Sequence, residues 1–102
     1  MKLLTKEILK QIPNLYAQEK SKDPIVYVKF FCPWSSWTWY ATEYSPEDKV
    51  FFGYVCGFEN ELGYFSLEEL ESIVGPGGLK IERDIHFKPT KLSEISNFGQ
   101  LN

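Results

Sequence analysis

The segment 37–70 constrains the fold of this chain more than any other part of the sequence. It reads WTWYATEYSPEDKVFFGYVCGFENELGYFSLEEL, with one alternating run from Trp37 to Tyr44 and a second apolar run from Lys49 to Cys56. Period-two alternation and a high content of β-branched and aromatic residues are typical of strands. The connections are too short for parallel crossovers, so the segment predicts an antiparallel meander.

A short helix is predicted directly after the meander. A brief strand near Leu62–Phe65 leads into residues 66–69, Ser-Leu-Glu-Glu, which have the form of a capping box. The glycine-rich run 75–78 should end this helix. Its predicted apolar stripe consists of Leu67, Leu70, Ile73 and Val74.

The flanking segments supply the remaining predicted elements. Thr5 can cap a helix that Pro13 ends, and Thr90 can cap a second short helix near the C-terminus. Residues 25–31 and 79–87 have the pattern of strands. We therefore predict an α+β fold in one domain spanning 1–102, with an antiparallel sheet of about five strands packed against two or three short helices.

Charge and cysteine content narrow the functional classes. The net charge is −3 and no Lys/Arg cluster occurs, which argues against nucleic-acid binding. We see neither a signal peptide nor a membrane-length apolar run, so we expect a cytoplasmic protein. Cys32 and Cys56 read as buried free thiols, and no cofactor is expected. Aromatic residues reach 17%, which predicts a partly apolar sheet face that serves a homodimer or a partner protein.

Strand alternation assigns the polar candidates to faces. Along 79–87, Glu82, Asp84 and His86 share a polar face that could hold a divalent metal or act in acid–base catalysis, although an exposed charged face is the simpler interpretation. Arg83 points to the apolar side and therefore needs a partner. That partner can be a carboxylate or a carbonyl, and Glu43 and Glu61 are possible carboxylates. Such a pair beside a cleft could bind a carboxylate or phosphate.

Aromatic residues are the candidates for recognition. In the first strand of the meander, Trp37, Trp39, Ala41 and Glu43 are predicted on one face, and Thr38, Tyr40, Thr42 and Tyr44 on the other. Trp34 follows Pro33 in a loop and is the tryptophan most expected to be exposed. Beside Tyr40 or Tyr64 it could stack on a ring or form an interface hot spot. Gly53 and Gly63 lie inside strands, which predicts a bulge or an aromatic ring crossing the bare backbone.

Two motifs within residues 25–92 resemble a known family. The sequences ELGYFSL at 61–67 and IERD at 81–84, together with Trp39, Tyr40 and Glu43 in the first strand of the meander, resemble small bacterial proteins of unknown function carried on plasmids, phages and other mobile elements. The resemblance implies an accessory role in mobile DNA, for example counter-defence. It implies no activity and no catalytic residues.

Three functional hypotheses follow from these observations. The leading one is a non-enzymatic binding protein that sequesters a protein or ligand, with candidate contacts at Trp34, Trp39, Tyr40, Glu43, Glu61, Tyr64 and Arg83. The second is a binder of a small anionic ligand such as a nucleotide, in which Arg83 holds the phosphate. The third is a metal-dependent hydrolase that uses Glu82, Asp84 and His86. No nucleophile motif accompanies His86, so an enzyme is the less favoured class.

Overall fold

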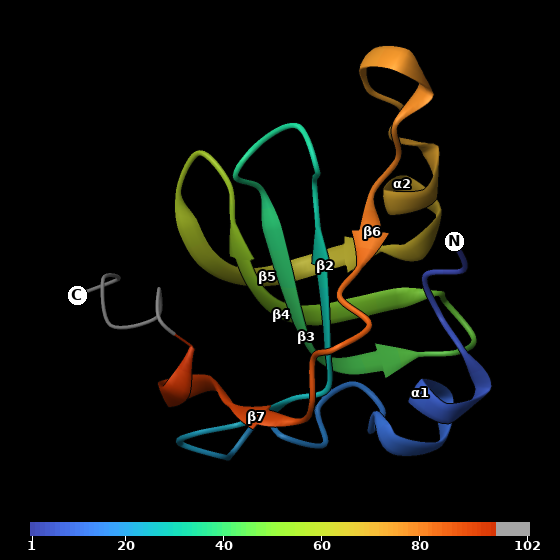
Figure 1. Cartoon of the computed structure of the whole chain (residues 1–102). Coiled ribbons are helices and arrows are strands. Elements are labelled where there is room, and N and C mark those ends of the chain that lie inside the picture. The colour runs from blue at the N-terminus through green and yellow to red at the C-terminus, as the bar shows by residue number, and fades with distance from the viewer. Residues whose placement is uncertain (96–102) are drawn as a thin grey trace.

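A computed structural model of the chain, which describes residues 1–95, confirms the predicted α+β class (Figure 1). Its centre is a five-stranded antiparallel sheet, and a second, two-stranded sheet lies below it in this view. The elements are α1 (Lys6–Gln11), β1 (Ile25–Val26), β2 (Val28–Phe31), β3 (Thr38–Ser45), β4 (Val50–Cys56), β5 (Asn60–Ser66), α2 (Leu67–Ser72), a 3-10 turn (Pro76–Gly78), β6 (Glu82–Arg83), β7 (Thr90–Lys91) and a second 3-10 turn (Leu92–Glu94).

The strand order of the large sheet is β5-β4-β3-β2-β6. The predicted meander forms its continuous part, because β3, β4 and β5 pair in sequence order through short turns. The predicted strand 25–31 is divided at Tyr27, so that β1 pairs with β7 and β2 pairs with both β3 and β6. This order leaves β5 and β6 at the two edges of the sheet.

A β-bulge at Thr42 corrects the predicted faces of β3. Ala41 and Glu43 lie opposite two consecutive residues of β4, so Thr42 is the extra residue between them. An extra residue reverses the alternation of all that follow it. Tyr44 therefore joins Trp39 and Ala41 in one core cluster. Glu43, predicted on the face of Trp39, lies on the opposite one.

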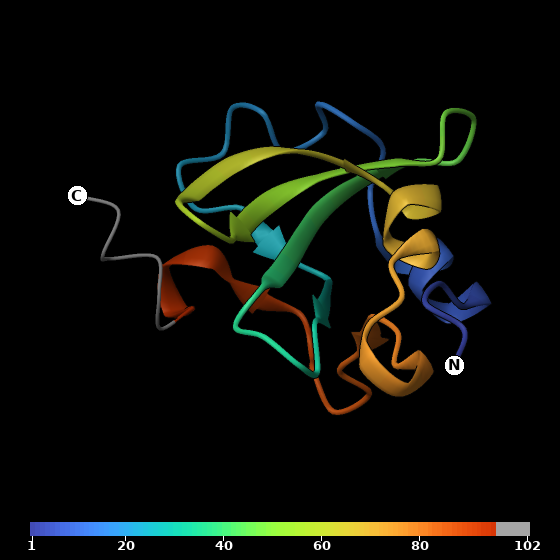
Figure 2. The same ribbon diagram turned by 90° about the horizontal axis from the view of Figure 1, so that it is seen from above.

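Both faces of the large sheet are covered. Leu3 and Ile12 of the N-terminal segment and Leu70 of α2 bury the first face, where they meet Trp39 and Phe51. Figure 2 shows both α-helices gathered at one end of the sheet, away from the C-terminal 3-10 turn. The second face is covered from the C-terminal side, where buried residues cluster and desolvation raises the pKa of Tyr54 to about 12. That second cluster contains Val26, Tyr40, Tyr54, Cys56, Leu92 and Ile95.

The helix caps form largely as their sequences predict. The Thr5 side chain accepts a hydrogen bond from the Ile8 amide at 3.3 Å, and Ser66 accepts one from the Glu69 amide at 2.9 Å. These bonds satisfy amides that the first turn leaves free. Val74 departs from its predicted place in the apolar stripe, because α2 ends at Ser72 and the Val74 side chain is exposed.

The predicted strand 79–87 was wrong over most of its length. Within it, Glu82–Arg83 forms the two-residue strand β6, and Lys80 makes a single antiparallel bridge with Val74. The following Asp84 side chain accepts a hydrogen bond from the His86 amide at 2.9 Å. This local bond forms a turn that competes with the strand. The predicted final helix forms as the 3-10 turn Leu92–Glu94, and Thr90 does not cap it. Thr90 lies in β7, and its hydroxyl donates to the Lys88 carbonyl. Within residues 1–95, no helix is long and apolar enough to cross a membrane.

Candidate functional site

Three loops converge at one end of the large sheet. They are residues 32–37 between β2 and β3, 57–59 between β4 and β5, and 73–79 after α2. In Figure 1 the first two form the upper loops of the sheet, and the third rises beside them above α2. Between the first and third loops lies a hollow of about 340 Å³, lined by Cys32, Trp34, Ser35, Trp37, Trp39, Ile73 and Ile81.

Two glycines hold the tryptophan rings in place. A Cβ atom at Gly57 would come closer than 3.0 Å to the Trp37 ring, and one at Gly75 would do the same to the Trp34 ring. The rings therefore rest on bare backbone, which any larger residue would obstruct. Trp34 and Trp37 are consequently half-buried, and Trp34 is less exposed than its loop position predicts.

Phe58 extends the aromatic surface into solvent. Its side chain is 96% exposed, and its ring packs edge-on against Trp37 with the centroids 5.3 Å apart. Trp37 in turn lies 5.7 Å from Trp39, whose ring is buried. Exposed apolar surface beside tryptophan side chains is a feature of many protein–protein interaction sites.

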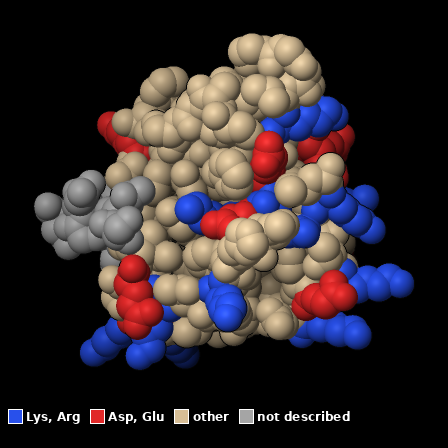
Figure 3. All heavy atoms as spheres, in the orientation of Figure 1, with Lys and Arg blue, Asp and Glu red and all other residues tan. Residues whose placement is uncertain are grey.

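The surface around these rings is almost free of charge. Of all residues in the three loops, only Glu59 is ionisable apart from the buried Cys32. In Figure 3 the upper end of the molecule is a continuous uncharged surface, with the acidic and basic side chains gathered below it. We call this region the tryptophan-loop surface, and it consists of Trp34 and Trp37, which line the hollow, and Phe58, which packs against Trp37. Its chemistry suits an apolar side chain and offers nothing to an anion.

The other candidate residues do not gather at this surface. Tyr40 is buried on the second face of the sheet, and Glu61 is exposed on the edge strand β5. Arg83 lies on the opposite edge, four strands from Glu61, which corresponds to about 19 Å. The expected pairing of Arg83 with Glu61 is therefore excluded by the strand order.

Glu43 anchors the loop before β1. Its side chain is 4% exposed, and its two carboxylate oxygens accept hydrogen bonds from the amides of Tyr16 at 2.8 Å and Gln18 at 2.7 Å. The Gln18 side chain continues this network, donating to the carbonyls of Ile25 and Thr42 and accepting from the Ile25 amide. Glu43 thus has a structural role, which its alternation pattern did not indicate. Sequence reasoning missed Gln18 entirely.

Tyr64 lies beside this network, on the second face. It is exposed and packs edge-on against Phe52, with the ring centroids 4.9 Å apart. A hydrogen bond with the Tyr16 hydroxyl, helped by desolvation, raises the pKa of Tyr64. Because Tyr64 and Trp34 lie on opposite faces, they do not form the single aromatic surface that their types suggested.

Arg83 contacts the N-terminus instead of a carboxylate. Its guanidinium donates to the Lys2 carbonyl, and its amide lies 3.1 Å from the Met1 sulfur. Its side chain also borders a small hollow of about 240 Å³ that Glu7 and Asp84 line as well. Two carboxylates at this hollow oppose the binding of an anion.

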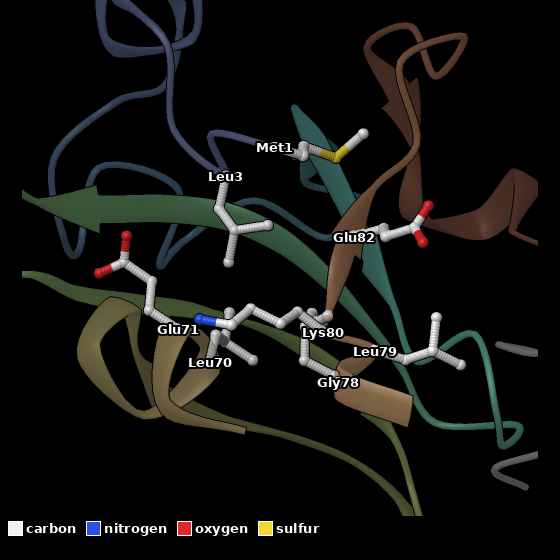
Figure 4. Close-up of a pocket in the computed structure, with 9 residues that line it drawn as sticks. Met1, Leu3, Leu70, Glu71, Gly78, Leu79, Lys80 and Glu82 are labelled. Atoms are coloured by element: carbon white, nitrogen blue, oxygen red, sulfur yellow. The ribbon is translucent and has the colours of Figure 1, made fainter. Parts of the chain in front are cut away.

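The three proposed metal ligands are dispersed. Asp84 lies 3.9 Å from the Lys29 ammonium, whereas His86 is exposed on the turn that follows. Glu82 borders a different pocket, and Figure 4 shows its carboxylate directed away from Leu3 and Leu70. In the part of the chain that the structure describes, no group of three or more His, Cys, Asp or Glu side chains could hold a metal ion.

Comparison with models of known protein families identifies the family of this chain. A family model described as "Protein of unknown function (DUF2958)" matches residues 3–101. The chain belongs to the DUF2958 family. No curated protein and no solved structure matches this DUF2958 chain. The match covers the tryptophan loops, the Glu43 network and both edge strands.

Proposed function

We propose that this DUF2958 protein is a non-enzymatic binding protein whose tryptophan-loop surface receives an apolar side chain of a partner protein. The observation that supports the proposal most directly is Phe58, which is 96% exposed beside an apolar hollow of about 340 Å³. A phenylalanine side chain that stays in water instead of being buried gives up about 1.5–3 kcal/mol of hydrophobic free energy. A partner that covers the ring recovers this free energy.

The composition of the hollow favours a protein over a small polar ligand. Among the side chains that line it, Ser35 is the only hydroxyl, and no cation or carboxylate is present. Small-molecule sites usually add a few convergent polar groups that fix the ligand's orientation. Tryptophan, in contrast, is among the residues most enriched in protein–protein hot spots.

The loops also support tight binding because they are held before the partner arrives. The Trp34 ring is fixed over Gly75 and the Trp37 ring over Gly57. The Cys32 amide, moreover, donates to the Trp37 carbonyl at 3.0 Å, which closes the first loop. Loops ordered in advance lose less conformational entropy on binding.

The cellular role that we propose rests on the sequence resemblance to proteins of mobile elements. A small protein with a rigid apolar surface, and with no nucleophile motif beside its single histidine within residues 1–95, suits sequestration of a host protein, for example a defence factor, in the cytoplasm. An anion-binding role for Arg83 receives less support, since its guanidinium is already bonded to the Lys2 carbonyl.

Replacing Phe58 with serine is expected to weaken partner binding at least about 30-fold, which corresponds to a hot spot of 2 kcal/mol. Tagged protein captures partners from a bacterial lysate, and quantitative mass spectrometry compares F58S with wild type. The control is Tyr16→Ser, which removes another exposed aromatic side chain from the second face. Because Phe58 is exposed, F58S should lower the free energy of unfolding by less than about 1 kcal/mol.

The expected result is at least one protein that wild type and the Y16S variant enrich equally and F58S does not. Equal enrichment of every captured protein by wild type and F58S would refute the proposed surface. If F58S and Y16S both fail to enrich the same protein, the proposed surface is also refuted. That result would show that binding depends on exposed aromatic side chains in general and not on their position.

A further inference from the structure

Gly63 is a strand glycine for which the described residues 1–95 show no steric requirement. It lies at the middle of β5, where a Cβ atom would have no neighbour within 4 Å. Its backbone is not in the left-handed region either, so nothing in the protomer requires glycine there. Glycine inside a strand costs about 0.5–1 kcal/mol relative to alanine. A glycine at such a position often marks the close approach of another backbone.

Among residues 1–95, no backbone hydrogen bond is made to the outward-pointing groups of β5 on either side of Gly63. The Leu67 amide donates to the Lys49 carbonyl at 3.0 Å, and these residues face each other in the register of β4 with β5. Hydrogen-bonded and non-bonded pairs alternate along an antiparallel ladder. Every second residue counted back from Leu67 therefore bonds to β4. The residues between them, which include Leu62 and Tyr64, direct their amides and carbonyls away from β4, toward the open edge of the sheet.

We propose that β5 pairs with β5 of a second copy, antiparallel and centred on Gly63. In this register Leu62 of one copy faces Tyr64 of the other, and both have outward-pointing backbone groups. Each such pair can exchange two hydrogen bonds. Gly63 then faces its own counterpart in a non-bonded pair, where the two Cα atoms approach to about 4.5 Å. The two five-stranded sheets become one continuous sheet.

The side chains on the edge are compatible with this pairing and disfavour the register centred on Glu61. Leu62 and Tyr64 are both exposed on the second face, so each buries an apolar side chain against the other copy. Glu61 faces Phe65 of the second copy. Centring the two-fold axis on Glu61 instead would place two carboxylates directly opposite each other, which destabilises a sheet. Self-complementarity of this kind favours a second copy over an unrelated strand.

Opposite charges at position 63 test both the partner and the register. G63E and G63K should each weaken self-association about fivefold, because like charges would meet at the two-fold axis. An equimolar mixture of G63E and G63K should associate about tenfold more tightly than either variant alone, since opposite charges then meet. Sedimentation equilibrium measures all three dissociation constants alongside wild type. Each new side chain enters open space, so both variants should fold normally.

The matched controls are Gln11→Glu and Gln11→Lys, which place the same charges on the exposed surface of α1. They should leave self-association unchanged, both separately and mixed. A wild-type protein that stays monomeric at all concentrations would overturn the proposal. So would a dimer that G63E and G63K do not weaken. If both weaken it and their mixture is no tighter, the edge accepts a different strand and the Gly63-centred pairing is wrong.

Discussion

Replacing Glu43 with glutamine is expected to lower the free energy of unfolding by about 2–4 kcal/mol. The carboxylate is buried, and each of its oxygens accepts one backbone amide, from Tyr16 and from Gln18. Glutamine has a single acceptor oxygen, so its NH₂ group would face a second donor and leave one part-buried amide without its acceptor. That amide loses a charge-assisted bond and gains nothing in return.

Urea unfolding followed by circular dichroism measures this loss. The matched control is Glu61→Gln, which makes the same chemical change at an exposed position of β5 and should change stability by less than about 0.5 kcal/mol. Hydrogen exchange should also show faster exchange at the Tyr16 and Gln18 amides in E43Q. Equal stabilities for E43Q and E61Q would contradict the structural role assigned to Glu43.

Replacing Gly53 with alanine is expected to cost about 3 kcal/mol, the upper range for overpacking. A Cβ atom there would come closer than 3.0 Å to the Tyr40 carbonyl group and the Ala41 Cα atom. These are backbone atoms of the neighbouring strand β3, so no side chain can rotate away to relieve the clash. The strands would have to separate at the bulge.

The control for Gly53 is Gly63→Ala, which makes the same substitution on the adjacent strand in open space. It should be neutral or stabilise the protomer by up to about 1 kcal/mol. Thermal and urea unfolding of the two variants, at a concentration where the protein is monomeric, give the comparison. A loss of less than about 1 kcal/mol in G53A would show that β3 can yield, which contradicts the close packing described here.

Local signals predicted much of the fold. The meander, the turn after Ser45 and the cap at Ser66 each depend on a few adjacent residues whose preferences agree. The bulge at Thr42 could not be predicted in the same way, since ATEY continues the strand pattern without interruption. One extra residue nevertheless moved Glu43 to the other face, which separated it from the tryptophans.

The candidate site was predicted only in part, because it depends on contacts between distant loops. Trp34 and Trp39 were identified from residue type alone. Phe58 was missed, although the scarcity of charge in loops 32–37, 57–59 and 73–79 was a signal that the sequence contained. The sequence also did not predict which glycines pack against aromatic rings. For the strand glycines Gly53 and Gly63 the sequence predicted a bulge or a crossing ring. Gly53 does lie at the bulge of β3, whereas the rings rest on the loop glycines Gly57 and Gly75.

The most direct test of the tryptophan-loop surface is photo-crosslinking from position 58. A photoreactive phenylalanine analogue replaces Phe58 in one protein and Tyr16 in a second, and both are irradiated inside bacterial cells. The account predicts a discrete adduct with another protein from position 58 and none of that mass from position 16. The absence of an adduct from position 58, or one that contains only a second copy of this chain, would contradict it.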